Sequence, residues 1–264
     1  MGSVDRVISF LTQNLGLNRA QNTDDVLGRP DSPEPRQAEA TSMVDCRPMQ
    51  ASLDSADLDA LLRPLSDKSS SDGDISAALV ELDQRIPKMH REKIGVALSR
   101  LAAHTCANLK GKLQAQALDM LNTHLSCTTP PHRLQALVCL ANGFMIGMPM
   151  PGIQNQGISE PANQTQAMAI IQEHFPVSAT DPQSMFLASS LVQSLVKALW
   201  TSRLNPDMHA AIIAFISRHP FGLGMEKQIK DNVIMNLQKA QSGRTIAESD
   251  NQKLRELLSA LNTA

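Results

Sequence analysis

The chain has 264 residues but no tyrosine, one tryptophan and six phenylalanines, so aromatic side chains fill little of any core that it forms. No apolar run approaches the roughly 20 residues needed to span a bilayer. Residues 1–17 lack the basic start and unbroken apolar stretch of a secretory signal. We therefore expect neither a transmembrane segment nor export by the general secretory route. The cysteines are few and irregularly spaced, which argues against a disulfide framework and favours reduced thiols: Cys46, Cys106, Cys127 and Cys139.

The motifs of several common chemistries are missing. The sequence has no GxxxxGKS/T, GxGxxG, GxSxG or HExxH pattern, so phosphate-loop, dinucleotide, hydrolase-elbow and zinc-protease functions lack support. A calcium loop around Gly73 also fails, because the alignment puts Lys68 and Leu79 at positions where carboxylates are needed. We expect no metal and no cofactor, and the residues do not select an enzymatic activity.

What is present divides the chain at about Asp74. Residues 1–73 are rich in Ser, Asp, Gln and Pro and contain one aromatic residue, Phe10. Such a segment has too little apolar surface to offset the entropy of ordering its backbone. We predict a largely disordered leader over residues 1–73, with short amphipathic helices at 3–16 and 54–65, followed by a helical domain over 74–264.

The pattern of the domain predicts an all-α fold, either a helical bundle or an irregular α–α stack. Asp74 is expected to cap the first helix, Pro87 to open the next and Gly111 to break it. Amphipathic helices joined by short turns continue to the end of the chain, and no stretch alternates like a strand. Residues 90–144 resemble HEAT or armadillo helix pairs, although no consensus residue recurs at a fixed period.

Two segments later in the chain stand out. Residues 147–163 are rich in Gly, Pro and amides, which predicts a long loop or a hinge between two helical halves. Residues 185–200 read MFLASSLVQSLVKALW and are apolar around most of a helical circumference. We expect this helix at the centre of the fold.

Charge is distributed unevenly although the formal net charge is only −2. Residues 1–84 hold 15 acidic and 7 basic residues, whereas residues 85–112 hold 7 basic residues and 1 acidic residue. The basic stretch lacks interleaved aromatics, so we expect no nucleic-acid partner. It is a candidate for partner binding, for a solvated helix face or for docking the acidic leader; its helical cations are Lys88, Arg91, Lys93 and Arg100.

A leucine cluster at the end of the leader is a second candidate for partner binding. Leu58, Leu61 and Leu62 lie on one side of two helical turns. Their LDALL sequence resembles the LxxLL peptides that dock on nuclear receptors. Packing onto the chain's own domain is the alternative.

Catalysis, if any, would centre on a concentration of histidines and cysteines. The candidates are His104, His124, Cys106, Cys127 and Cys139. A thiol nucleophile needs a neighbouring histidine and an exposed position, and these cysteines lie in predicted helices without strained turns. Zinc could use His124 and Cys127, whereas His104 and Cys106 would point apart on a helix. The alternative is that the cysteines are small core residues, so whether the chain is an enzyme stays open and we lean against it.

The organisation of the chain, a polar leader with an amphipathic first dozen residues joined to a helical domain, resembles that of bacterial type III secreted effectors. The resemblance covers residues 1–73 and implies export into a host cell, a secretion chaperone bound to the leader and a host protein as partner. It suggests a virulence protein that acts by protein binding. The alternatives are an enzyme on an unfamiliar helical scaffold and a helical adaptor resident in the cytoplasm; peripheral membrane contact stays open in each case.

Overall fold

The computed structural model describes residues 55–145, 157–176, 181–200, 204–219, 227–242 and 246–263. All regular structure in these ranges is helical, which confirms the all-α prediction for the described part of the chain. The α-helices are α2 Ser55–Ser66, α3 Asp72–Arg85, α4 Arg91–Ala107, α5 Gly111–His124, α6 Pro130–Gly143, α7 Pro161–His174, α8 Pro182–Ala198, α9 Pro206–Arg218, α10 Lys227–Ser242 and α11 Glu248–Thr263. Short 3-10 turns, η2 Ile86–Lys88 and η3 Leu125–Cys127, precede α4 and α6.

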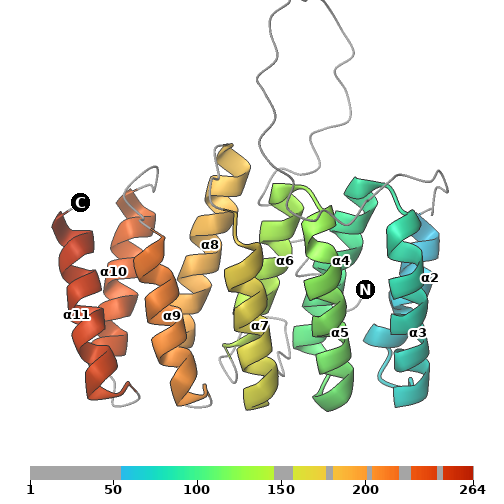
Figure 1. The fold of residues 1–264 in the computed structure, drawn as a ribbon, viewed down its shortest axis with the longest axis horizontal. Helices are drawn as coiled ribbons and strands as arrows, with labels where there is room; N and C mark the ends of the chain where they lie inside the picture. The colour runs from blue at the N-terminus through green and yellow to red at the C-terminus, as the bar shows by residue number, and fades with distance from the viewer. Residues whose placement is uncertain are drawn as a thin grey trace, which may run out of the picture.

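The helices form a row of hairpins that stack side by side in two layers (Figure 1). We call α2, α4, α6, α8 and α10 the even layer, and α3, α5, α7, α9 and α11 the odd layer. Each helix packs against its neighbours in the same layer and against a helix of the other layer. A single hydrophobic cluster, mostly Leu, Ile, Val, Ala and Met, runs through the described residues. The architecture is therefore an α–α stack, in which each hairpin contacts mainly the next one.

Local sequence signals explain where the helices begin. Proline occupies the first position of α6, α7, α8 and α9, where the missing N–H costs nothing. The start of α3 differs from the prediction. Ser71, rather than Asp74, is the N-cap, and the two form a capping box in which the Ser71 N–H donates to Asp74 Oδ2 at 3.0 Å. Asp74 is thus the third residue of the helix.

Glycines bring α4 and α6 close together in the middle of the stack. A Cβ atom at Gly95 would lie 2.5 Å from the His132 ring, and one at Gly143 would lie 2.6 Å from the Cys106 sulfur. The α4–α6 and α6–α8 contacts are far more extensive than those between adjacent odd helices. Helices α4, α6 and α8 are therefore the most tightly packed part of the stack.

The folded part begins earlier than predicted. Helix α2 packs against α3 and α4, and its leucines at 58, 61, 62 and 65 are buried in the core. The stack as described thus begins with α2. Four leucines on one face of this helix provide the apolar area for packing, which the overall composition of residues 1–73 does not indicate. Residues 1–54 of the predicted leader, including the helix at 3–16, lie outside the described residues.

The segment predicted as a loop or hinge is partly described. Within 147–163, residues 147–156 lie outside the described ranges, and α7 already begins at Pro161. The helices before and after it remain packed together, since α7 contacts α5 and α6 while α8 contacts α6. The core is continuous across this point.

Candidate functional site

Of the three cysteines proposed as candidate nucleophiles, Cys106 and Cys139 are core residues and Cys127 is partly buried beside the core. Cys106 and Cys139 are buried on the facing helices α4 and α6, and the Cys106 thiol donates to the Cys139 carbonyl oxygen at 3.3 Å. Burial raises the pKa of the Cys106 thiol well above its ordinary value, and it raises the pKa of Cys139 to about 12. Cys127 is disulfide-bonded, so the expectation of a reduced thiol is wrong at this position. None of the three offers a thiolate to a substrate at neutral pH.

The predicted histidines contact other groups than these cysteines. His104 is buried, with its Nδ1 3.1 Å from Asn108 Nδ2. His124 Nε2 lies 2.7 Å from Asp83 Oδ1 and links α5 to α3. No group of three or more potential ligands converges on a metal position among the described residues.

The leucine cluster and the basic stretch are used inside the stack. Leu58, Leu61 and Leu62 are buried between helices, so the structure favours packing on the chain's own domain over docking to a partner. Arg100 on α4 pairs with Asp59 on α2. Arg91 Nη2 reaches the Thr128 carbonyl oxygen at 3.4 Å.

Of the four predicted cations, Lys88 in η2 is exposed and Lys93 in α4 is half-buried. The four therefore do not form a uniformly free basic surface, since Arg100 and Arg91 already have partners inside the stack.

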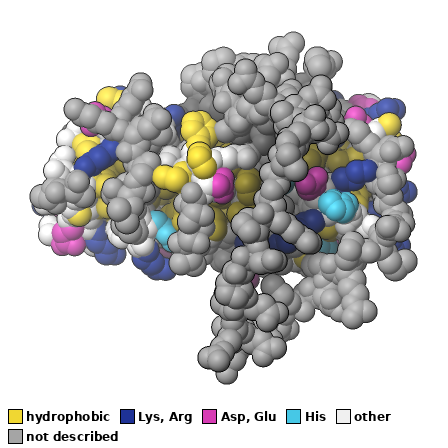
Figure 2. All heavy atoms as spheres, turned by 90° about the horizontal axis from the view of Figure 1, so that it is seen from above, with side chains coloured by type: hydrophobic (Ala, Val, Ile, Leu, Met, Phe, Trp, Pro, Cys, Tyr) yellow, Lys and Arg dark blue, Asp and Glu magenta, His cyan; other side chains and the backbone are white. Residues whose placement is uncertain are grey.

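A surface that sequence reasoning missed lies on the even layer. Val96 on α4, Phe186 on α8 and Met235 on α10 are 43%, 47% and 44% exposed. Among the described residues, the other large hydrophobic side chain with comparable exposure is Val80 on α3, at 46%. Figure 2 looks onto the ends of the helices; in this view a group of apolar side chains reaches the surface left of centre beside an Asp or Glu side chain, with Lys and Arg side chains further out on both sides.

The two layers also differ in charge. Counting residues whose side chains are described, the even helices carry eight Lys/Arg and four Asp/Glu, whereas the odd helices carry five Lys/Arg and ten Asp/Glu. The exposed apolar side chains thus lie mainly on the net-positive layer. A surface that combines both properties favours association with an acidic partner.

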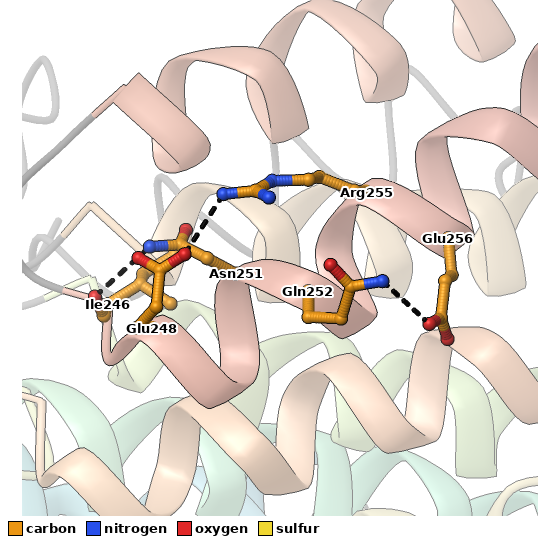
Figure 3. A network of polar contacts seen from close by, with 6 residues as sticks. All are labelled: Ile246, Glu248, Asn251, Gln252, Arg255 and Glu256. Atoms are coloured by element: carbon orange, nitrogen blue, oxygen red, sulfur yellow. Dashed lines mark hydrogen bonds and ion pairs between the residues drawn. The ribbon is translucent and has the colours of Figure 1, made fainter.

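The odd layer presents a polar surface at its C-terminal end. On and just before α11, Arg255 Nη2 pairs with Glu248 Oε1 at 3.0 Å, Gln252 Nε2 donates to Glu256 Oε1 at 3.1 Å and Asn251 donates to the Ile246 carbonyl (Figure 3). Exposed pairs of this kind contribute little to stability and leave no apolar area to bury. This face is suited to contact with water.

Buried amides of α5 and α7 connect successive hairpins. Gln114 Nε2 donates to the carbonyl oxygens of Thr105, Leu109 and Gly157 at 2.9, 3.0 and 3.2 Å. Asn163 Nδ2 donates to Gln114 Oε1 at 3.0 Å. The network ties the end of α4 and the start of α5 to α7, and it satisfies carbonyls that no helix pairs.

The comparisons with known proteins give no match: no family model, no curated protein and no solved structure is similar to this chain. Within the described residues, no helix has both the length and the apolar character required to cross a bilayer.

Proposed function

We propose that the chain is a non-enzymatic binding module whose even layer holds another protein. The observation that carries this proposal is the row of stacked hairpins, whose more basic layer exposes Val96, Phe186 and Met235. A row of helices presents an extended surface, and exposed apolar side chains surrounded by polar ones are typical of protein contact sites.

The proposal is supported by the state of the candidate catalytic groups. Among the described residues, the free thiols of Cys106 and Cys139 are buried, and desolvation holds the pKa of each above its ordinary value. An enzyme that used them would have to open α4 away from α6. Replacing Cys106 or Cys139 with serine and retaining every activity in the cell would remove the enzymatic alternative.

Three full-length proteins serve as baits in affinity capture. The Kd of the captured partner is then measured for each of them. They are the wild type, the even-layer variant V96E/F186E/M235E and the odd-layer variant V80E. We expect the even-layer variant to bind at least about tenfold more weakly, since central apolar side chains dominate protein interfaces. V80E is the matched control because Val80 is equally exposed on the opposite layer. Equal affinities for all three would refute the proposal.

The setting of this binding follows from the leader's resemblance to type III effectors. We propose that the partner is a host protein and that residues 1–73 direct export, with a chaperone bound to them. A fusion of residues 1–73 to a reporter enzyme tests this. If the reporter shows no export that depends on the secretion apparatus, the effector hypothesis fails and a resident cytoplasmic adaptor is the remaining explanation.

A further inference from the structure

The C-terminal ends of α8 and α10 form a small basic and aromatic surface. We call Lys197, Trp200, Met235 and Lys239 the α8–α10 patch. Lys239 Nζ lies 5.2 Å from the centroid of the Trp200 ring, and Trp200 Nε1 donates to the Asn236 carbonyl oxygen at 2.9 Å. Both lysines are exposed, Met235 is 44% exposed and Trp200 is half-buried. The indole is therefore fixed in orientation while part of its surface meets solvent.

Helical spacing aligns these side chains with one another. Met235 and Lys239 are four residues apart on α10, so they share one face of the helix. Phe186 precedes Lys197 by three turns on the same face of α8, about 16 Å along the axis. The patch thus extends along α8 toward a second exposed aromatic side chain.

The two lysines of the patch have no carboxylate partner within the described part of the chain. Where side chains are described, α8 and α10 carry Lys197, Lys230 and Lys239 against a single acidic residue, Asp231, which lies one turn before Met235. Neither Lys197 nor Lys239 forms an ion pair within the described part of the chain. A ligand that brings carboxylates to them gains attraction without breaking an existing pair.

We infer that the α8–α10 patch binds an acidic, amphipathic segment of the partner protein. Its carboxylates pair with Lys197 and Lys239, and its apolar side chains cover Trp200 and Met235. This inference rests on the proposed function and names the chemistry of the partner. An anionic membrane fits less well, because recognition of lipid headgroups typically uses clusters of about four to eight basic residues.

The composition of the chain supplies the assay. Trp200 is the one tryptophan and the chain has no tyrosine, so ultraviolet-excited emission near 340 nm reports on the patch itself. Full-length protein is titrated with a synthetic 15-residue helical peptide of Glu and Leu, and with a control peptide in which Lys replaces each Glu. We expect the acidic peptide to shift the Trp200 emission in a saturable way that weakens with added salt, and the basic peptide to leave it unchanged.

Charge reversal provides the decisive variant. K197E/K239E should bind the acidic peptide at least about tenfold more weakly and should acquire affinity for the basic peptide. The matched control is K112E, because Lys112 is an exposed lysine on α5 in the odd layer. Circular dichroism equal to the wild type establishes that both variants fold. Acquired binding of the basic peptide also shows that the reversed patch is intact.

Other results would overturn the inference. Equal binding of both peptides would show that only apolar contacts matter, and an emission shift with phosphatidylserine vesicles but not with the acidic peptide would identify a membrane. If the Trp200 emission of the protein alone changes with salt to the same extent at every protein concentration, another segment of the same chain occupies the patch. If that change depends on the protein concentration, a second copy of the chain occupies it.

The result separates this inference from the proposed function. If K197E/K239E keeps the acidic peptide and the captured partner, whereas V96E/F186E, which leaves Met235 and the rest of the patch unchanged, loses the partner, the proposed function is supported and the inference about the patch is refuted. If neither variant changes partner binding, the proposed function fails as well.

Discussion

Replacing Gln114 with methionine tests whether the buried amide network holds the hairpins together. Gln114 is 1% exposed and donates from Nε2 to the carbonyls of Thr105, Leu109 and Gly157. Methionine has nearly the same length and volume, so the packing change is small. What is lost is the hydrogen bonding of buried carbonyls at the junction of α4, α5 and α7.

The expected magnitude follows from the number of groups left unpaired. A buried carbonyl without a partner costs on the order of 1 kcal/mol or more, and Asn163 also loses one of its two acceptors. We expect Gln114→Met to lower the free energy of unfolding by about 3 kcal/mol, a large part of a typical total of about 5–15 kcal/mol. With a urea slope of about 2 kcal/mol/M, the midpoint falls by about 1.5 M.

Urea unfolding followed by circular dichroism at 222 nm measures the change. The control is Gln84→Met, because Gln84 is exposed on α3 and its substitution should change stability by less than about 0.5 kcal/mol. If Gln114→Met unfolds at the midpoint of the wild type with the same slope, the carbonyls do not depend on Gln114 and the network does not stabilise the stack.

Three further predictions concern pH, packing and thiols. Burial lowers the pKa of His132, His174, His209 and His219 in the folded protein. Because these histidines take up protons more readily in the unfolded chain, the stability that they contribute should be complete above about pH 6.5 and should fall at lower pH. An equal Tm at pH 7.5 and pH 5.5 would contradict this prediction. Gly143→Ala should destabilise the protein by about 1–2 kcal/mol in urea titrations, since its Cβ would lie 2.6 Å from the Cys106 sulfur; adding Cys106→Ala should recover part of the loss, and a Gly143→Ala variant as stable as the wild type would show that the helices separate freely. Cys106 and Cys139 should react with a disulfide reagent such as DTNB only after unfolding; rapid reaction of the native protein would mean that α4 and α6 open.

The helices themselves were predictable from the sequence because their signals are local. Apolar periodicity and proline at the first helical position are properties of a few adjacent residues, and both are present where α6 and α9 begin. Helix α2 was assigned to the leader because its four buried leucines belong to a region, residues 1–73, whose overall composition is polar. Burial of Leu62 depends on α3 and α4, which a local pattern does not contain.

The candidate site was harder to predict for the same reason. The helix around Phe186 is apolar around most of its circumference, so periodicity does not say which side meets solvent. We expected this helix at the centre of the fold, and its Phe186 side chain is 47% exposed. Amide side chains such as Gln114 and Asn163 have no local signal of burial, yet both are buried, and each donates to a carbonyl oxygen outside its own hairpin. The charge difference between layers appears only once alternate helices are known to share a side.

The close approach of α4 and α6 gives this molecule a mechanical property. Because hairpins contact mainly their neighbours in a row, a change of tilt at Gly95 or Gly143 is carried to everything beyond it. With helices spaced about 10 Å apart, the α8–α10 patch lies roughly 20 Å from this junction, so a rotation of about 5° displaces it by about 2 Å. A substitution of Gly95 or Gly143 that changes the angle between α4 and α6 would therefore shift the α8–α10 patch, although neither glycine belongs to it.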